Sequence, residues 1–306
     1  MKVAFICSGN NGVNAIVQAQ YDSLVRYGLD TVIIPIIGKG ILGYLANIPS
    51  IRTKLNQHKP DVVHAHYSFC GILASLSTRR PVVTSLMGSD VISSGFWRKI
   101  IRYFALHQWD ATIVKSEDMK TKSGLRDVHV IPNGVDIETF RPLDQIDCRS
   151  RLGWGVKENI VLFAADPKRA EKNFALAQMV MSHPGLHNVV LKVVHNVKHE
   201  DIPTYLNAAN VLLLTSNWEG SPNVVKEAMA CNLSIVSTDV GDVKWLLSQV
   251  EGSFVDNADA SKLSKSLLMA ISFRGLSRGR QRLLELGLDS ESVCDKLFRV
   301  YMGVVR

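Results

Sequence analysis

The chain lacks the features that mark secreted, disulfide-stabilised and membrane-spanning proteins. Its 306 residues include only five cysteines, which lie far apart and show no metal-ligand spacing: Cys7, Cys70, Cys148, Cys231 and Cys294. Such cysteines are typical of reduced, mostly buried thiols in a cytoplasm. No apolar run approaches the roughly 20 residues of a membrane-spanning helix. The opening segment 1–7 is too short for a signal-peptide core and predicts a first β-strand, so we expect a cytoplasmic protein.

Several sequence motifs are also missing. There is no low-complexity tract, no Asp-x-Asp metal motif and no nucleic-acid recognition motif, so we expect no metal, no cofactor and no nucleic-acid partner. The composition, 46% hydrophobic and 21% charged, is ordinary for a globular enzyme. The length suits two α/β domains of about 150 residues each.

Positive charge is concentrated in one stretch. The formal net charge is +7, and residues 40–110 hold eight Lys and Arg against three Asp. Within this stretch, Gly95–Leu106 mixes cations and large apolar residues at helical spacing, which would suit the surface of an anionic membrane. The alternative is a helix packed on the core with solvated charges. Under either interpretation we expect a cytoplasmic protein. The membrane interpretation adds peripheral attachment to the inner face of the membrane.

Short β-rich segments alternate with helical patterns along the chain. The predicted strands are 2–7, 31–35, 61–66, 81–85, 111–114 and 128–131, followed by 160–165, 189–194, 211–215, 234–238 and 252–255. The predicted front-half helices are 13–27, 42–57, 71–77, 95–107 and 117–123. This alternation predicts an α/β protein with two facing Rossmann-like domains built on parallel sheets. We place an N-terminal domain at 1–145 and a C-terminal domain at 146–306, leaving open that the last helix packs back on the first domain.

Two glutamates with seven residues between them, Glu219 and Glu227, mark the most informative segment. A buried strand at 211–215 precedes them, and Ser221 is expected to cap a helix that has Pro222 in its first turn. One carboxylate therefore lies in a loop at the end of a strand, where α/β proteins bind ligands, and the other lies on the helix. The helix start favours an anion. Carboxylates beside an anion site are best explained as hydrogen-bond acceptors for the hydroxyls of a nucleotide-sugar.

A charged loop in the same half supports this interpretation. Arg169 and Lys172 follow the strand at 160–165, just where a helix begins. They are either a solvated surface or the cations that bind the anion, and their position in the same domain as Glu219 favours binding.

The front half contributes weaker candidates. Gly12 lies in a glycine turn that is either a plain tight turn or a ligand loop, and its spacing is not that of a dinucleotide fingerprint. His66 ends a strand and is either structural or part of the site. Asp90 either caps a helix or accepts from a sugar hydroxyl, and Asn133 belongs to a turn near the domain junction.

The combination resembles the retaining GT-B glycosyltransferases of family 4. Three motifs carry the resemblance, in the family's order: the Pro-Asn-Gly-Val-Asp sequence at 132–136, the loop with Arg169 and Lys172, and Glu219-x7-Glu227 continuing through residue 230. The similarity covers nearly the whole chain and is strongest at 209–241.

The resemblance implies a GT-B fold and a role for each candidate. Arg169 and Lys172 would hold the donor's diphosphate, Glu227 the ribose hydroxyls, and Glu219 the sugar ring. The donor would also contact Gly220, Ser221, Asn223, Val224 and Gly12. Asp90 and Asn133 would lie on the acceptor or cleft side. The reaction implied is transfer of a hexose from a UDP- or GDP-sugar to a hydroxyl of a lipid-linked or polysaccharide acceptor, with retained configuration and no metal.

The chain departs from the family at several positions. Met87 stands where many relatives carry histidine, so His66 would partly take over that role. Asp242 stands where a second glycine follows Gly241 in relatives. Met87 and a chain shorter than most relatives keep open the alternative of a catalytically degenerate GT-B protein that acts as a partner or binding subunit. A separate alternative is a GT-B nucleotide-sugar epimerase.

Overall fold

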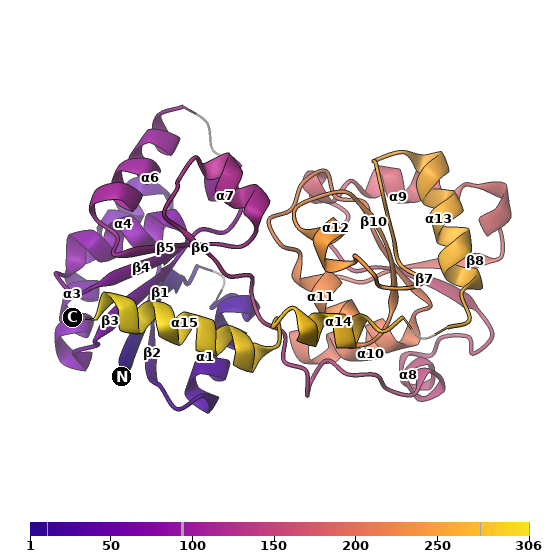
Figure 1. Cartoon of the computed structure of the whole chain (residues 1–306), viewed down its shortest axis with the longest axis horizontal. Helices are drawn as coiled ribbons and strands as arrows, with labels where there is room; N and C mark the ends of the chain where they lie inside the picture. Colours follow the sequence, from indigo (N-terminus) through magenta and orange to yellow (C-terminus); the bar gives the residue numbers. More distant parts are fainter. Residues whose placement is uncertain (11, 93–94, 276, 306) are drawn as a thin grey trace. The chain divides into compact units, whose positions relative to one another are not determined.

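The computed structural model describes residues 1–10, 12–92, 95–275 and 277–305 and divides the chain into two compact units (Figure 1). Unit 1 comprises Met1–Gly134 and Ser290–Arg306, and unit 2 comprises Val135–Asp289. Each unit has its own sheet and its own hydrophobic core.

Unit 1 is a doubly covered parallel sheet in the order β2-β1-β3-β4-β5-β6. Its strands are β1 Lys2–Ser8, β2 Asp30–Ile36, β3 Val62–His66, β4 Val82–Ser85, β5 Ala111–Val114 and β6 His129–Val130. Its helices are α1 Ala15–Arg26, α2 Gly40–Leu45, α3 Ile48–His58, α4 Ser68–Ser77, α5 Ser89–Ile92, α6 Phe96–His107, α7 Glu117–Ser123 and α15 Ser290–Val304. Strand side chains alternate between the faces: Val3 and Phe5 pack with α1 and α15, whereas Ala4 and Ile6 pack with α3 and α4.

Unit 2 repeats this architecture with a parallel sheet in the order β11-β10-β9-β7-β8. Its strands are β7 Asn159–Phe163, β8 Val189–Val193, β9 Val211–Leu214, β10 Ser234–Thr238 and β11 Phe254–Asp256. Its helices are α8 Gln145–Leu152, α9 Phe174–Met181, α10 Ile202–Ala208, α11 Asn223–Ala230, α12 Val243–Leu246, α13 Ala260–Ser272 and α14 Gly279–Glu285, with 3-10 turns η1 Ala170–Lys172, η2 Pro184–Leu186 and η3 His199–Asp201. Val161 and Phe163 pack with α9 and α13, and Ile160 and Leu162 face the α10 and α11 side.

The predicted α/β class and parallel sheets are confirmed. All eleven predicted strands are present, and their ends agree within two residues. The single helix predicted at 42–57 was wrong, because the structure has α2 and α3 instead. Pro49 lies in the first turn of α3, where its missing amide is tolerated, and the Asn47 side chain donates to Gly43 O at 2.8 Å between the two helices.

We expected the boundary between the two domains after residue 145, but the structure has it between Gly134 and Val135. Residues 135–145 belong to unit 2, because Val135 pairs with Asp289 and its amide donates to Leu288 O at 2.9 Å. The chain then returns, and α15 completes unit 1 by packing on α1 and the sheet. The expected C-terminal domain 146–306 therefore ends at 289.

Candidate functional site

The loops that could hold a ligand in unit 2 meet at one edge of its sheet. Strands β10, β9, β7 and β8 are neighbours and all parallel, so their carboxyl ends lie side by side. Lys172 follows β7, His199 follows β8, Glu219 follows β9 and Asp242 follows β10. This edge is where open α/β sheets bind ligands.

Lys172 and Glu219 form the centre of this site. Lys172 Nζ lies 2.5 Å from Glu219 Oε1, and the two side chains are only 13% and 14% exposed. Ser216 Oγ donates to the same carboxylate oxygen at 2.7 Å. The Thr215 hydroxyl donates to the backbone carbonyls of Lys172 and Asn173, both at 3.0 Å. The β7 and β9 loops are thereby held together, and a cation and a carboxylate lie half-buried at the end of the strands.

Arg169, the other cation predicted to bind the donor, pairs with Glu171 in this structure. Its side chain is 56% exposed and contacts Glu171 Oε1 through Nε at 2.8 Å and through the terminal nitrogen at 2.5 Å. An exposed pair of this kind contributes little stability. Arg169 can therefore exchange Glu171 for another anion at small cost.

Glu227 is paired with a histidine that the sequence did not indicate. His199 Nε2 lies 2.9 Å from Glu227 Oε1, and this hydrogen bond raises the pKa of His199. The His199 ring also lies 5.2 Å from that of Phe140. No spacing pattern links 199 to 227; the only hint is that residue 199 follows the carboxyl end of a predicted strand.

Helix α11, which carries Glu227, begins at Asn223, one residue later than a cap at Ser221 would place it. Pro222 occupies the cap position of α11, no side chain caps the helix, and the Ser221 cap prediction was wrong. Gly220 and Ser221 form the loop before it, and Val224 lines a small hollow together with Lys172 and Ser216. Asn223 and Val224 are the first two helical residues, so their amides point out of the helix start.

His66, a predicted catalytic residue of unit 1, is a buried neutral ring. It is 4% exposed and stacks on His64 with ring centroids 4.4 Å apart. Burial, and then the charge of Lys115, lower the pKa of His66 to about 3. Its Nε2 has no hydrogen-bond partner among the described residues. A ring with this pKa is a poor proton acceptor at pH 7.

Asp90, another candidate of unit 1, has a structural role in this geometry. Asp90 accepts from the Ser68 amide at 3.2 Å, from the Ser68 hydroxyl and from the Met87 amide at 2.7 Å, so it fixes the loop in which Met87 lies. Gly12 has a φ of +81°, which favours glycine, and its neighbour Asn11 lies outside the described residues. Asn133 is the penultimate residue of the first segment of unit 1.

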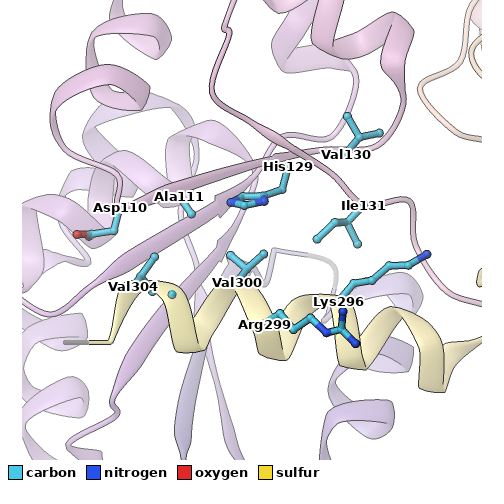
Figure 2. A pocket seen from close by; sticks show the side chains of 10 residues that line it. Asp110, Ala111, His129, Val130, Ile131, Lys296, Arg299, Val300 and Val304 are labelled. Atoms are coloured by element: carbon cyan, nitrogen blue, oxygen red, sulfur yellow. The ribbon is translucent and has the colours of Figure 1, made fainter.

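Unit 1 also has a hollow of about 540 Å³ that contains none of the predicted site residues. It lies between α15 and the ends of β5 and β6 (Figure 2). Val300, Val304 and Ile131 provide apolar walls, while Lys296 and Arg299 lie along α15. Its lining includes one carboxylate, Asp110, but none of the residues of the three motifs, so the edge of unit 2 remains the better candidate.

The described ranges contain neither a membrane-spanning helix nor a cluster of metal ligands. No helix there combines the length and the apolar character needed to span a bilayer. Likewise, no three His, Cys, Asp or Glu residues in these ranges are grouped so that they could hold a metal ion.

Two family models match the chain. Residues 2–139 match Glycosyltransferase Family 4, and residues 159–272 match Glycosyl transferases group 1. The two matches correspond to the two successive sheets and together span most of the sequence. The chain belongs to the family 4, group 1 glycosyltransferases, and its fold is GT-B.

Individual relatives agree with this assignment. TuaC of Bacillus subtilis, named for teichuronic acid biosynthesis, is 25% identical over 68% of this chain, which spans 60% of that relative. A UDP-Gal:alpha-D-GlcNAc-diphosphoundecaprenol alpha-1,3-galactosyltransferase of Escherichia coli is 23% identical over 85% of this chain and 80% of that protein. Among solved structures, Anabaena HepE in complex with UDP and glucose matches with a TM-score of 0.79 at 17% identity, over 99% of this chain and 100% of that chain.

Proposed function

We propose that this protein is a retaining glycosyltransferase that transfers a hexose from a UDP- or GDP-sugar to an acceptor hydroxyl. The observation that carries the proposal is the half-buried Lys172–Glu219 pair beside the start of α11, with Glu227 on the same helix. Cation, carboxylates and helix amides together match a ligand that has both a diphosphate and hydroxyl groups.

Each part of the donor has a partner in unit 2. Lys172 and Arg169 would bind the diphosphate, with Arg169 leaving Glu171 to do so. Glu227 would accept from the ribose hydroxyls and share its carboxylate with His199. Glu219 would accept from the sugar ring. The neighbouring amides of the loop and helix start would complete the contacts.

The chemistry needs no protein nucleophile. The acceptor oxygen bonds to the anomeric carbon as the bond from that carbon to the diphosphate breaks on the same face. The acceptor's proton passes to the departing phosphate oxygen. Negative charge grows on the diphosphate in this step, and Lys172, the helix dipole and Arg169, once it has left Glu171, would stabilise it.

The acceptor proposed is a lipid-linked or polysaccharide precursor at the inner face of the membrane. The name of the Escherichia coli relative, which includes a diphosphoundecaprenol acceptor, supports it. So does α6, whose exposed stripe of Phe96, Lys99, Tyr103 and Leu106 combines apolar groups with a cation. The proposed product is a cell-surface polysaccharide or a glycolipid.

Binding of donors can be tested first by thermal unfolding with UDP, GDP, ADP and their sugar derivatives. At a hundredfold excess over Kd, the correct nucleotide should raise the unfolding midpoint by roughly 5 °C. Lys172→Met should abolish most of this rise, because it removes a cation from the diphosphate. Lys168→Met, which changes an exposed lysine four residues away, should keep it.

Turnover is then measured as release of nucleoside diphosphate with acceptor extracts. Release that requires both donor and acceptor supports the transferase. Binding without release from any donor would instead identify a partner subunit. Interconversion of UDP-sugars without acceptor would identify an epimerase, and no nucleotide response at all would refute the site.

A further inference from the structure

The contact between His199 and Glu227 is part of unit 2, and the proposed chemistry assigns His199 no step. His199 Nε2 lies 2.9 Å from Glu227 Oε1, and the Glu227 side chain is 12% exposed. The other carboxylate oxygen, Oε2, accepts no hydrogen bond from any described residue and is not enclosed by protein. One oxygen of Glu227 is therefore held by the protein, while the other is available to a ligand.

The fold of unit 2 holds the His199 ring in place. Val197 and Ile202, on either side of it in the chain, pack against the core of the unit, and the Ile202 amide donates to the His199 carbonyl at the end of η3. The ring itself lies 5.2 Å from that of Phe140, which is 1% exposed. A side chain supported in this way can fix the geometry of a neighbour that contacts a ligand.

The surroundings of His199 favour its protonated form. The hydrogen bond to Glu227 raises the pKa of His199, burial opposes this, and the charges of Glu227 and Asp136 raise it further. Asp136 is the last residue of the Pro-Asn-Gly-Val-Asp sequence, one of the three family motifs. A protonated histidine makes a charge-assisted hydrogen bond to a carboxylate, which is stronger than a neutral one. The hydrogen bond between His199 and Glu227 therefore restrains the carboxylate in its ionised form.

We propose that His199 positions Glu227 through Oε1 so that Oε2 accepts hydrogen bonds from the ribose hydroxyls of the donor. This inference rests on the proposed function of Glu227, and it makes His199 a positioning residue. A carboxylate that is already oriented loses less rotamer freedom when the ligand binds, so a nucleotide with ribose hydroxyls binds more tightly. A nucleotide without those hydroxyls gains nothing from the orientation.

Nuclear magnetic resonance tests whether the pair exists in solution. The ring signals of His199 are assigned by their loss in His199→Phe and followed over pH. The pKa of His199 should be lower in Glu227→Gln than in the wild type, because glutamine lacks the charge that stabilises the protonated ring. The control is Glu200→Gln, at an exposed neighbour that pairs with Lys198, and it should leave the titration of His199 in place. An unchanged titration in Glu227→Gln would overturn the proposal.

Calorimetry with UDP and with its dideoxy analogue, which lacks both ribose hydroxyls, tests the positioning role at a temperature where every variant is folded. His199→Phe keeps an aromatic ring but loses the donor, so it should weaken binding of UDP about fivefold and of dideoxy-UDP less than about twofold. His199→Gln restores a nitrogen donor and should bind UDP within about twofold of the wild type. His187→Phe, the same change at an exposed histidine before β8, should alter neither affinity. GDP and dideoxy-GDP provide the same comparison for a guanine donor.

Combining the substitutions shows whether His199 acts through Glu227. When His199→Phe is added to Glu227→Ala, UDP affinity should not fall further, since the carboxylate that His199 orients is already gone. Independent losses would mean that His199 contacts the ligand itself, and equal losses for UDP and dideoxy-UDP would leave it only a structural role; either result overturns the proposal. If the wild type binds neither UDP nor GDP, the proposed function fails and the positioning role fails with it. Parallel losses in a wild type that binds UDP refute the positioning role alone.

Discussion

At the residue scale, the two glutamates have different partners and therefore different expected roles. Glu219 is paired with Lys172, the cation that we propose binds the diphosphate. Glu227 is paired with His199, on the side that we propose binds the ribose. We expect them to affect different steps when they are removed.

Glu227→Ala should weaken binding of the free nucleotide about tenfold, since it removes charged acceptors from the ribose hydroxyls. Glu219→Ala should lower turnover about tenfold or more while nucleotide affinity changes less than about threefold. Titration calorimetry and diphosphate release measure the two effects. Glu200→Ala, at an exposed glutamate, is the control and should change neither. Small and equal effects from both variants would show that the site is misplaced.

Some of these residues could be predicted and others could not. Lys172, Glu219 and Glu227 follow from strand ends, a helix start and the family motif, all of which are local in sequence. His199 acts through a partner 28 residues away, across folded loops, and no local pattern indicates such a contact. His66 was predicted from its strand end, but its burial among unit 1 side chains could not be read from that position.

At the element scale, periodicity predicted strands better than helix ends. A parallel strand buried on both faces is a short apolar run, which is easily recognised. The start of α11 and the break between α2 and α3 depend on single prolines and on side-chain hydrogen bonds, so the sequence pattern located them less well.

Helix α6 carries the prediction of membrane binding. Its outward stripe includes Phe96, 74% exposed, and Tyr103, 55% exposed, with Lys99 between them. Replacing Phe96 and Tyr103 by serine should reduce binding to vesicles with anionic lipid at least fivefold, because the apolar contact with the bilayer is lost. Co-sedimentation with vesicles measures this binding, and added salt should weaken vesicle binding by the wild-type protein. Met302→Ser, at another exposed apolar residue, should have no effect. Vesicle binding that persists in the double variant would contradict the prediction.

At the scale of the whole molecule, the last helix closes the first unit. Tyr301 is fully buried, and its hydroxyl lies 2.6 Å from His64 Nδ1, while His64 Nε2 lies 2.9 Å from Ser85 Oγ. Residues more than two hundred positions apart thus share one buried polar network.

Tyr301→Phe should destabilise the protein by about 1–3 kcal/mol, since it leaves a buried histidine nitrogen unsatisfied. Urea unfolding measures the loss. Tyr27→Phe removes a hydroxyl that bonds to Asp295 at 3.2 Å on the surface, and it should cost less than about 0.5 kcal/mol. Equal stability of both variants would show that the buried network contributes nothing.

The sequence alone determined the α/β class, the strand order along the chain and the loops that carry the donor candidates. Hydrophobic periodicity, turn residues and helix starts are local signals, and each acts within a few neighbouring residues. The tertiary structure decided the return of α15 to unit 1, the partners of Glu219 and Glu227, and the burial of Lys226 and of Asp242. Those features arise where distant segments meet, because burial and charge pairing depend on neighbours in space.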